Sequence, residues 1–363
     1  MTHYNEEEEE FHARDRKQFR KIRKHAQQTD RSKFKKTDLQ PAQEWIPSEH
    51  LKEGRVLSIS GEGSLVDDAQ GNQYICSLKG LLKKEKHLSK NIIAVGDRVL
   101  FQVASEKEGA IVQVAPRTSF LSRVDISGRK EQLIAVNVDL AIISVSIVEP
   151  PFKPSLVDRY LIAAEKGNMQ PVIAINKIDL LPIASADEKE IYEMFLSAYE
   201  PLGYPVLSLS CTTNIGLDAL RAILQHKTSV FSGQSGVGKS SLLNACFGLT
   251  LRTGELTQKT AKGAHTTTRA ELLTLPGGGY CVDTPGIRSF ALWKLEKQDI
   301  IDHFKEFLPY KKKCKYSNCT HMAEPECAVI KAVEKEKISL LRYTSYQILI
   351  DEVTSKSEKT TWS

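Results

Sequence analysis

Continuous apolar runs alternate with amphipathic segments through the middle of the chain, from about residue 116 to residue 293. Runs such as 138–147 and 170–175 are apolar at successive positions, which is typical of strands buried on both faces of a sheet. The predicted strands are 138–147, 170–175, 204–209, 228–231, 272–275 and 280–282, and the predicted helices are 155–168 with Ser155 as N-cap, 188–199, 217–224 and one beginning at 241. Strands alternating with helices predict a parallel, doubly wound α/β sheet.

The pattern before residue 116 is different. Residues 51–115 contain short alternating segments that are separated by turns rich in Gly and Asn. The predicted strands here are 55–60, 73–78, 95–103 and 110–114. Short strands with this punctuation predict a small all-β barrel such as an OB-fold.

Both ends of the chain lack this regularity. Helical spacing predicts helices over 297–308, 328–336 and 339–352, whereas the residues after 353 are polar and are expected to fray. Residues 1–50 are charged and poor in apolar residues, so they are expected to be a disordered tail. The predicted division is therefore 1–50, 51–115, 116–293, 294–352 and 353–363.

Charge is spread unevenly over the 363 residues, although the formal net charge is only +5. Residues 12–36 hold eleven Lys or Arg against two Asp, and 79–90 and 311–315 are also rich in Lys. Such segments neutralise nucleic-acid phosphates, and the alternative is a solvated tail or loop. No apolar run reaches membrane-spanning length and the N-terminus has no secretory segment, so a cytoplasmic protein without a membrane partner is expected.

A complete phosphate-loop pattern follows the predicted strand 228–231. In such a loop, glycines turn backbone N–H groups toward phosphates, the Lys reaches the outer phosphates and the Ser hydroxyl ligates Mg²⁺. Here the Lys is Lys239 and the Ser is Ser240. The predicted nucleotide contacts of this loop are Gly233, Gln234, Ser235, Gly236, Val237, Gly238, Lys239, Ser240 and Ser241.

Two further segments have the residues needed to read a guanine base. Asn176-Lys177-Ile178-Asp179 follows a buried strand, and the Asp179 carboxylate can accept hydrogen bonds from guanine N1–H and the exocyclic amine. Adenine offers no such pair of donors. Ser210 and Cys211 follow the next predicted strand and are expected to present backbone N–H groups to the guanine oxygen, with a plain strand-to-helix turn as the alternative.

Two more segments complete the predicted triphosphate site. In the first, Asp283 to Gly286, the Asp is expected to hold Mg²⁺ through water and the Gly286 N–H to contact the γ-phosphate. In the second, 265–269, a threonine is expected to close over Mg²⁺, with Thr268 preferred to Thr267. The two guanine-reading segments precede the phosphate loop in the chain, which is the reverse of the usual order of GTPases. The α/β domain is therefore predicted to be circularly permuted.

Four soft ligands lie close together near the C-terminus. Cys314, Cys319, His321 and Cys327 form a Cys₃His set that suits tetrahedral structural Zn²⁺, although the spacing differs from a simple Cys-x2-Cys finger. The other cysteines in apolar patterns, Cys76, Cys246 and Cys281, are predicted to be core thiols.

These motifs resemble the circularly permuted GTPases of the RsgA/YjeQ type, over roughly residues 51–350. The resemblance implies GTP hydrolysis in maturation of the small (30S) ribosomal subunit, rRNA binding by the barrel, activity stimulated by the subunit, and a zinc site at the Cys₃His set. It also suggests His265 as the residue that orients the attacking water, because Ile287 follows the switch glycine where many GTPases have Gln. The alternative is that His265 only lines the loop.

Gly236 stands where potassium-activated GTPases carry Asn, so no strong potassium requirement is expected. A monomer is expected. Two other functions remain open at this stage. One is a P-loop ATPase or kinase, which the 176–179 segment disfavours. The other is an RNA-binding module whose nucleotide site is only structural.

Overall fold

The computed structural model describes residues 50–68, 70–79, 92–124, 131–251, 270–283 and 295–361. Nearly all of the predicted N-terminal tail and of the lysine-rich segment 79–90 lies outside these ranges. Among the described residues, no helix combines the length and apolar character needed to span a membrane.

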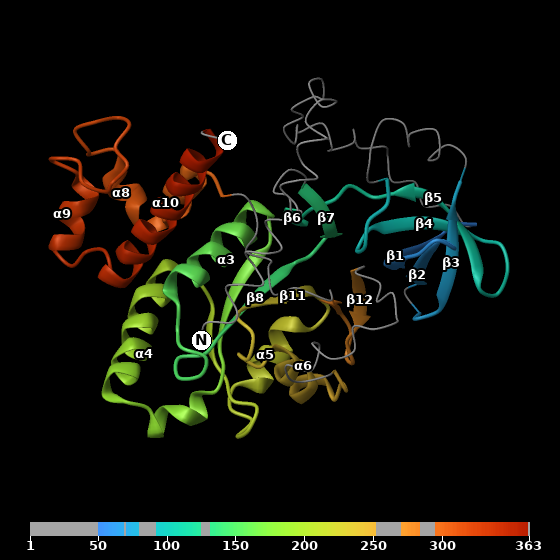
Figure 1. Ribbon diagram of the computed structural model, residues 1–363. Coiled ribbons are helices and arrows are strands. Elements are labelled where there is room, and N and C mark those ends of the chain that lie inside the picture. Colours follow the sequence, from blue (N-terminus) through green and yellow to red (C-terminus); the bar gives the residue numbers. More distant parts are fainter. Residues whose placement is uncertain are drawn as a thin grey trace, which may run out of the picture. The chain divides into compact units, whose positions relative to one another are not determined.

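A closed five-stranded barrel occupies the N-terminal part of the described chain (Figure 1). Its strands are β1 (Lys52–Ile59), β2 (Ser64–Asp68), β3 (Gln73–Leu78), β4 (Arg98–Val103) and β5 (Glu108–Val114). The order is β1-β2-β3-β5-β4, and antiparallel pairing of β1 with β4 closes it. Alternate side chains such as Val56, Val66 and Ile111 fill the interior, so the predicted OB-like barrel is confirmed.

The strand β2 was not among the predicted strands. Its sequence, Ser-Leu-Val-Asp-Asp, has only two apolar residues and no alternation. It forms because it pairs on one side with β1 and on the other with β3, and such pairing is invisible in a local pattern. A bulge between Val56 and Ser58 bends β1 so that both pairings fit the barrel.

A six-stranded sheet forms the centre of the middle region. Its strands are β8 (Leu140–Val145), β9 (Gln170–Ile175), β10 (Val206–Ser208), β11 (Thr228–Ser232), β12 (Glu271–Thr274) and β13 (Tyr280–Asp283). The order is β10-β9-β8-β11-β13-β12, and every pair is parallel except β13 with β12. The central strands β8 and β11 are buried along their whole length. The apolar run of β8 predicts this burial, whereas β11 has only two apolar residues, Val230 and Phe231.

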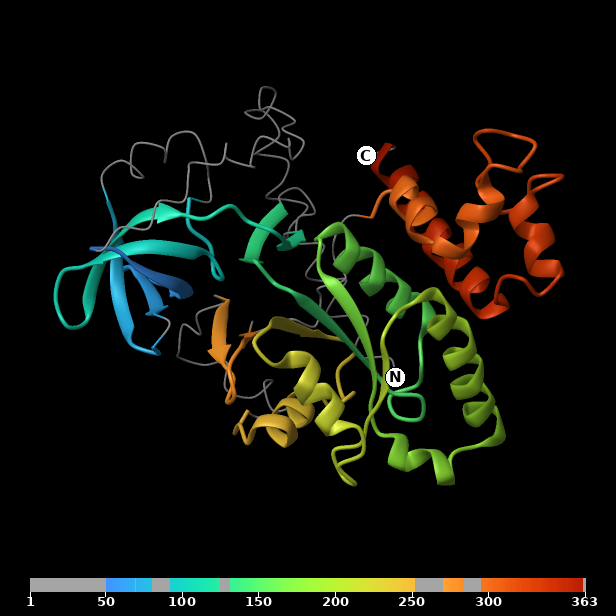
Figure 2. The same cartoon turned by 180° about the vertical axis from the view of Figure 1, so that it is seen from behind.

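Helices cover both faces of this sheet (Figures 1 and 2). They are α3 (Pro154–Lys166), α4 (Ala186–Tyr199), α5 (Leu217–Leu224) and α6 (Lys239–Phe247), with short 3-10 turns at Ile178–Ile183 and Glu200–Leu202. The prediction of Ser155 as the N-cap of α3 is wrong. Pro154 begins the helix and Lys153 is the N-cap, because proline is favoured at the first helical position.

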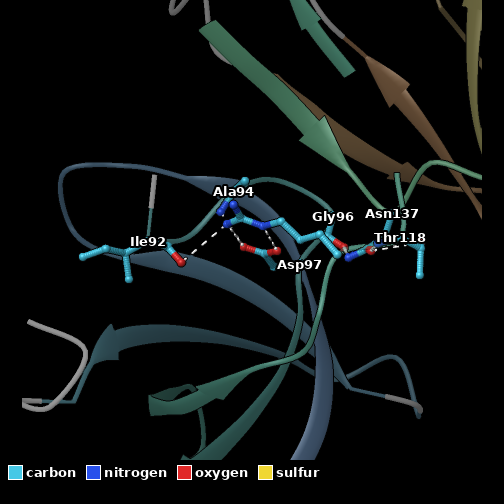
Figure 3. A network of polar contacts seen from close by, with 7 residues as sticks. Ile92, Ala94, Gly96, Asp97, Thr118 and Asn137 are labelled. Atoms are coloured by element: carbon cyan, nitrogen blue, oxygen red, sulfur yellow. Dashed lines mark hydrogen bonds and ion pairs between the residues drawn. The ribbon is translucent and has the colours of Figure 1, made fainter. Parts of the chain in front are cut away.

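A two-stranded antiparallel sheet of β6 (Phe120–Val124) and β7 (Glu131–Val136) lies between the barrel and the larger sheet in the chain. Polar side chains tie this region to the barrel, as Figure 3 shows. Arg117 donates to both carboxylate oxygens of the fully buried Asp97, at 2.8 and 2.9 Å. Asn137 donates to the Gly96 carbonyl at 3.0 Å and accepts from the Thr118 amide at 2.9 Å. The two Asn137 bonds satisfy backbone groups of Gly96 and Thr118, which lie outside the strands.

The C-terminal region is helical. It contains α7 (Lys297–His303), a 3-10 turn at Lys305–Phe307, α8 (Leu308–Lys311), α9 (Ala328–Glu334) and α10 (Leu340–Thr361). Its core includes Phe304, Phe307, Tyr346 and Leu349, and Ile162 of α3 packs into the same cluster. The prediction of a frayed polar tail after residue 353 is wrong, because α10 continues to Thr361. In this extension the hydroxyls of Thr354 and Ser355 donate to the carbonyls of Ile350 and Asp351, one turn earlier in the helix, at 2.8 Å each.

Candidate functional site

The predicted nucleotide-binding segments that the structure describes lie at one edge of the larger sheet. Segments 176–179, 210–211 and 233–241 follow the carboxyl ends of β9, β10 and β11, and Asp283 ends β13. In open parallel sheets, ligands bind outside the carboxyl ends of the strands, where neighbouring loops converge. Segments that are far apart in the chain therefore contribute to a single site.

The loop between β11 and α6 depends on glycine at its first and last positions. Gly233 has φ +136°, and an added Cβ would lie 2.0 Å from the Ser144 carbonyl oxygen of β8. Gly238 has φ +89°, and an added Cβ would lie 2.4 Å from the Asn176 amide nitrogen. A side chain at either position would collide with its neighbours, so glycine lets the loop press against β8 and against the Asn176 side chain.

Lys239 begins α6 and folds back over the loop. Its ammonium group donates to the carbonyl oxygens of Gly233 at 2.8 Å and Gln234 at 2.7 Å. Ser235 and Gly236, at the crest of the loop, are exposed. The cation therefore lies inside a curve of backbone beside the N-terminus of a nine-residue helix, an arrangement that favours a bound anion.

Asn176 joins the base-reading segment to the phosphate loop. Its side chain is buried and donates to the Val237 carbonyl at 2.8 Å, while the Cys211 thiol lies 3.8 Å from its side-chain oxygen. Lys177, which follows it, is in the left-handed conformation with φ +64°. The three predicted loops are thus held together by one amide side chain.

The Asp179 carboxylate is held by the neighbouring loop. The Ser210 hydroxyl, which is fully buried, donates to Asp179 at 2.6 Å and accepts from the Thr213 amide at 3.1 Å. Asp179 itself is partly exposed, so a carboxylate oxygen remains open to a ligand. Such a preorganised acceptor discriminates strongly between bases, because a base without matching donors leaves it unpaired.

The remaining predicted residues fall into two groups. Ser240 and Ser241 lie in the first turn of α6, and Asp283 ends β13, the strand next to β11. His265, Thr267, Thr268 and Gly286 lie outside the described residues, so their proposed roles stay predictions.

The Cys₃His residues come together in the C-terminal region. The ligand atoms of Cys314, Cys319, His321 and Cys327 all lie within 4.8 Å of one another. The Cys314 and Cys327 sulfurs are 3.9 Å apart, and the His321 Nδ1 lies 3.6 and 3.5 Å from them. Zinc–sulfur bonds of about 2.3 Å place tetrahedral sulfurs about 3.8 Å apart, so the spacing suits a tetrahedral ion.

The protonation chemistry of the cluster is consistent with a cation. Burial lowers the pKa of His321, which keeps the imidazole neutral, as a ligand must be. Without a cation, burial raises the pKa of the Cys319 thiol to about 12, with Cys327 adding to the effect. A bound cation reverses this preference and makes the thiolate the stable form.

Helix α10 supports the loop that carries these ligands. The hydroxyl of Tyr343 donates to the His321 carbonyl at 2.9 Å, and the Tyr346 hydroxyl donates to the Thr320 carbonyl at 2.5 Å. Burial would raise the pKa of Glu324, but hydrogen bonds lower it to about 2. The carboxylate accepts from the Thr320 hydroxyl and amide, both at 2.5 Å, and from the Met322 amide at 3.0 Å. The loop is therefore built around the ligand positions by its own backbone.

Sequence reasoning missed a buried charge network between α3 and α10. Arg342, 2% exposed in its side chain, pairs with Asp158 and also donates to Glu306 at 2.6 and 3.2 Å. One signal was available, because Arg342 shares a helical face with Tyr346 and Leu349, at spacings of four and seven residues. An arginine on an apolar stripe indicates a buried partner, but the sequence does not say which one.

Comparison with known proteins covers most of the chain. Residues 114–293 match the protein family described as RsgA GTPase. The small ribosomal subunit biogenesis GTPase RsgA of Chlorobaculum parvum is 41% identical over 310 residues, which are 83% of this chain and 97% of that protein. Its counterpart in Chromohalobacter salexigens is 42% identical over 306 residues, which are 84% of each chain.

Solved structures agree with these relatives. The crystal structure of YjeQ from Thermotoga maritima superposes with a TM-score of 0.68 at 32% identity, covering 84% of this chain and 99% of the other. YloQ, described as a circularly permuted GTPase, gives a TM-score of 0.66 at 29% identity, covering 85% and 96%. The predicted circular permutation is confirmed. With this identity over nearly the full length of its relatives, the chain belongs to the RsgA GTPase family.

Proposed function

We propose that this protein binds GTP at the carboxyl edge of the larger sheet and hydrolyses it during biogenesis of the small ribosomal subunit. The main support for the nucleotide site is the 2.8 Å hydrogen bond from the Asn176 side chain to the Val237 carbonyl. This bond joins the base-reading loop to the phosphate loop. The ribosomal role rests on the names of the relatives, which are small ribosomal subunit biogenesis GTPases. The protein is an enzyme, a GTPase that releases GDP and phosphate.

The described residues account for substrate binding in the following way. Asp179, oriented by Ser210, accepts hydrogen bonds from the guanine edge. Lys239 exchanges the Gly233 and Gln234 carbonyls for outer phosphate oxygens, while the loop amides cradle the phosphates. Ser240, Asp283 and, as predicted, Thr268 would hold Mg²⁺, which neutralises developing charge on the phosphates when bound.

The attacking water needs a positioning group, and His265 is the proposed one. Because Ile287, which follows the switch glycine, cannot hydrogen-bond a water, intrinsic turnover is expected to be slow and to rise when a partner completes the site. The small subunit and its rRNA are the proposed partner, in the cytoplasm. The lysines at 311, 312, 313 and 315 lie on the described C-terminal region, where Lys311 pairs with Asp302 and Lys315 with Glu326. We further propose that the Cys₃His cluster holds one structural zinc ion.

GTP hydrolysis by the purified protein, with and without small ribosomal subunits, tests the proposed function. We expect slow GTP turnover that rises at least about tenfold with subunits, and no ATP turnover. Lys239→Ala is expected to lower the stimulated rate by about two orders of magnitude, because it removes a cation that stabilises transferring phosphate. ATP turnover equal to GTP turnover would indicate a general P-loop ATPase instead.

A second prediction concerns base recognition. Ser210→Ala removes the donor that orients Asp179 and is expected to weaken GTP binding by about tenfold, since the lost hydrogen bond is to a charged group. Binding measured by equilibrium titration with GTP and GDP should weaken equally, because both carry guanine. Ser208→Ala, on the preceding strand, is the control, since its hydroxyl contacts Tyr192 and not Asp179. Unchanged GTP affinity in Ser210→Ala would remove Ser210 from the base site.

A further inference from the structure

Helices α5 and α6 lie side by side, and each directly follows a loop of the proposed nucleotide site (Figures 1 and 2). The base-reading loop 210–216 leads into α5, and the phosphate loop 233–238 leads into α6. Apolar side chains of both helices join one buried cluster against the larger sheet, among them Leu220 and Leu243. The two loops are therefore connected through the helices that follow them.

A charged side chain also joins these two helices. Arg221 of α5 donates its Nε to the Cys246 carbonyl at 2.8 Å and a terminal nitrogen to the Ala245 carbonyl at 3.3 Å. Both carbonyls belong to the last turn of α6, where a helix leaves its carbonyl groups without intrahelical partners. Because α6 has no basic residue of its own in this turn, the cation that favours a helix C-terminus comes from α5.

The beginning of α5 is tied to the base-reading loop and to α6. The Ser210 amide donates to the Ile215 carbonyl at 3.0 Å, which closes the loop just before α5 begins at Leu217. The Cys246 thiol of α6 lies 3.9 Å from the Leu217 carbonyl, and Arg221 reaches α6 one turn further along α5. The last turn of α6 is thus held against the turns of α5 that directly follow the base-reading loop.

We propose that Arg221 is a positioning residue for GTP binding, which fixes α6 relative to the base-reading loop. This role rests on the proposed GTP site. A bound nucleotide spans both loops, with its base at Asp179 and its outer phosphates at Lys239, so the separation of the two loops must match one ligand. Lys239 and Ser240 begin α6 and move with it. A site whose two parts are already held at this separation loses less freedom when it binds the nucleotide.

Other contacts of α6 limit the size of the effect. The Asn244 side chain donates to the Leu251 carbonyl and accepts from the Leu251 amide, both at 2.9 Å, which fixes the end of the helix. The Arg221 side chain is 40% exposed, so water can reach the helix end when the guanidinium is gone. We therefore expect Arg221→Met to weaken GTP and GDP binding by about three- to tenfold. Arg221→Lys keeps the cation but lacks the planar fork, and its affinity should lie in between.

Arg221→Met is the test, with Asp218→Asn as the matched control. Asp218 bonds the same guanidinium from within α5, but its side chain is 96% exposed, and its loss leaves both carbonyl contacts of Arg221 in place. Equilibrium titration with fluorescent GDP and GTP analogues should show about three- to tenfold weaker binding in Arg221→Met. Asp218→Asn should change the affinity by less than about twofold, since solvent screens this pair.

A double-mutant cycle with Ser210→Ala separates positioning from general loosening of α6. Ser210→Ala frees the Asp179 carboxylate, so the base contact no longer depends on a fixed separation of the two loops. In that background Arg221→Met should cost less than about twofold in GTP affinity, because residues that act through one shared contact are not additive. A substitution that only loosens the phosphate loop would cost the same factor in both backgrounds.

Equal GTP affinity in Arg221→Met and the unaltered protein would overturn the inference. The same factor lost with and without Ser210→Ala would also overturn it, because Arg221 would then act on the phosphate loop alone. If the unaltered protein binds no guanine nucleotide, the proposed function itself fails, and this outcome is distinct from both.

Discussion

Cys327→Ser is expected to abolish stoichiometric zinc binding and to lower the stability of the C-terminal region by about 4 kcal/mol or more. The size follows from linkage, since an ion present at about a thousand times its dissociation constant contributes about 4 kcal/mol to the folded state. Cys327 is 3% exposed, and its sulfur lies 3.5 Å from the His321 Nδ1, so no water replaces it easily. Metal content by elemental analysis and the thermal midpoint are the measurements.

The control for this substitution is Cys246→Ser. Cys246 is also buried, but it lies in the core of the larger sheet, with its sulfur 3.9 Å from the Leu217 carbonyl. A serine hydroxyl there keeps a partner, and we expect one zinc per chain as in the unaltered protein. Full zinc content in Cys327→Ser, or a midpoint unchanged by a chelator, would show that the cluster holds no structural ion.

Most strands of the larger sheet could be predicted because the signal for each lies in its own short stretch of sequence. Strands buried on both faces must be apolar throughout, and this identified β8 and β9 within three residues at each end. The phosphate loop and the Asn176 segment follow such strands directly, so their convergence at one edge followed from the parallel topology. Nothing in that argument required knowledge of distant contacts.

The elements that were missed depend on partners. Strands β2, β6 and β7 are short and mixed in polarity, and they are strands because neighbouring strands complete their hydrogen bonds. Arg55 of β1 donates to the Thr228 hydroxyl of β11 at 2.6 Å, a contact between residues 173 positions apart. A single sequence contains the residues of such contacts but not their pairing.

The pairing in the charge network between α3 and α10 could not be predicted from sequence either. Its loss is expected to cost a large part of the stability of this contact. Arg342 satisfies two carboxylates at once, and its guanidinium also lies over the rings of Phe304 at 4.4 Å and Tyr199 at 5.0 Å. Burial raises the pKa of Asp158, and the Arg342 charge works against that rise. The arginine pKa is raised well above its usual value despite burial, because Asp158 and Glu306 favour the cation. Both carboxylates depend on this one cation.

Arg342→Met is therefore expected to destabilise the contact between α3 and α10 by about 3–5 kcal/mol, because it leaves two carboxylates buried without their partner. The suitable measurement is amide hydrogen exchange in α10, which reports local opening without requiring that the whole chain unfolds in one step. Exchange should accelerate by roughly a hundredfold to a few thousandfold, at tenfold for each 1.4 kcal/mol. Adding Asp158→Leu and Glu306→Leu should recover much of the loss, since an apolar cluster replaces the stranded charges.

The matched control is Arg159→Met, which breaks a pair between the same two helices at the surface. Arg159 bonds Glu352, whose side chain is 43% exposed, so solvent screens the pair and its loss should cost less than about 1 kcal/mol. Arg342→Lys keeps the charge but cannot make the same forked contact with Asp158 and Glu306. Its α10 amides are expected to exchange at a rate between those of the unaltered protein and of Arg342→Met. If the α10 amides of Arg342→Met exchange no faster than those of Arg159→Met, the buried charge network contributes no more stability than the surface pair. In that case apolar packing alone holds α10 to α3.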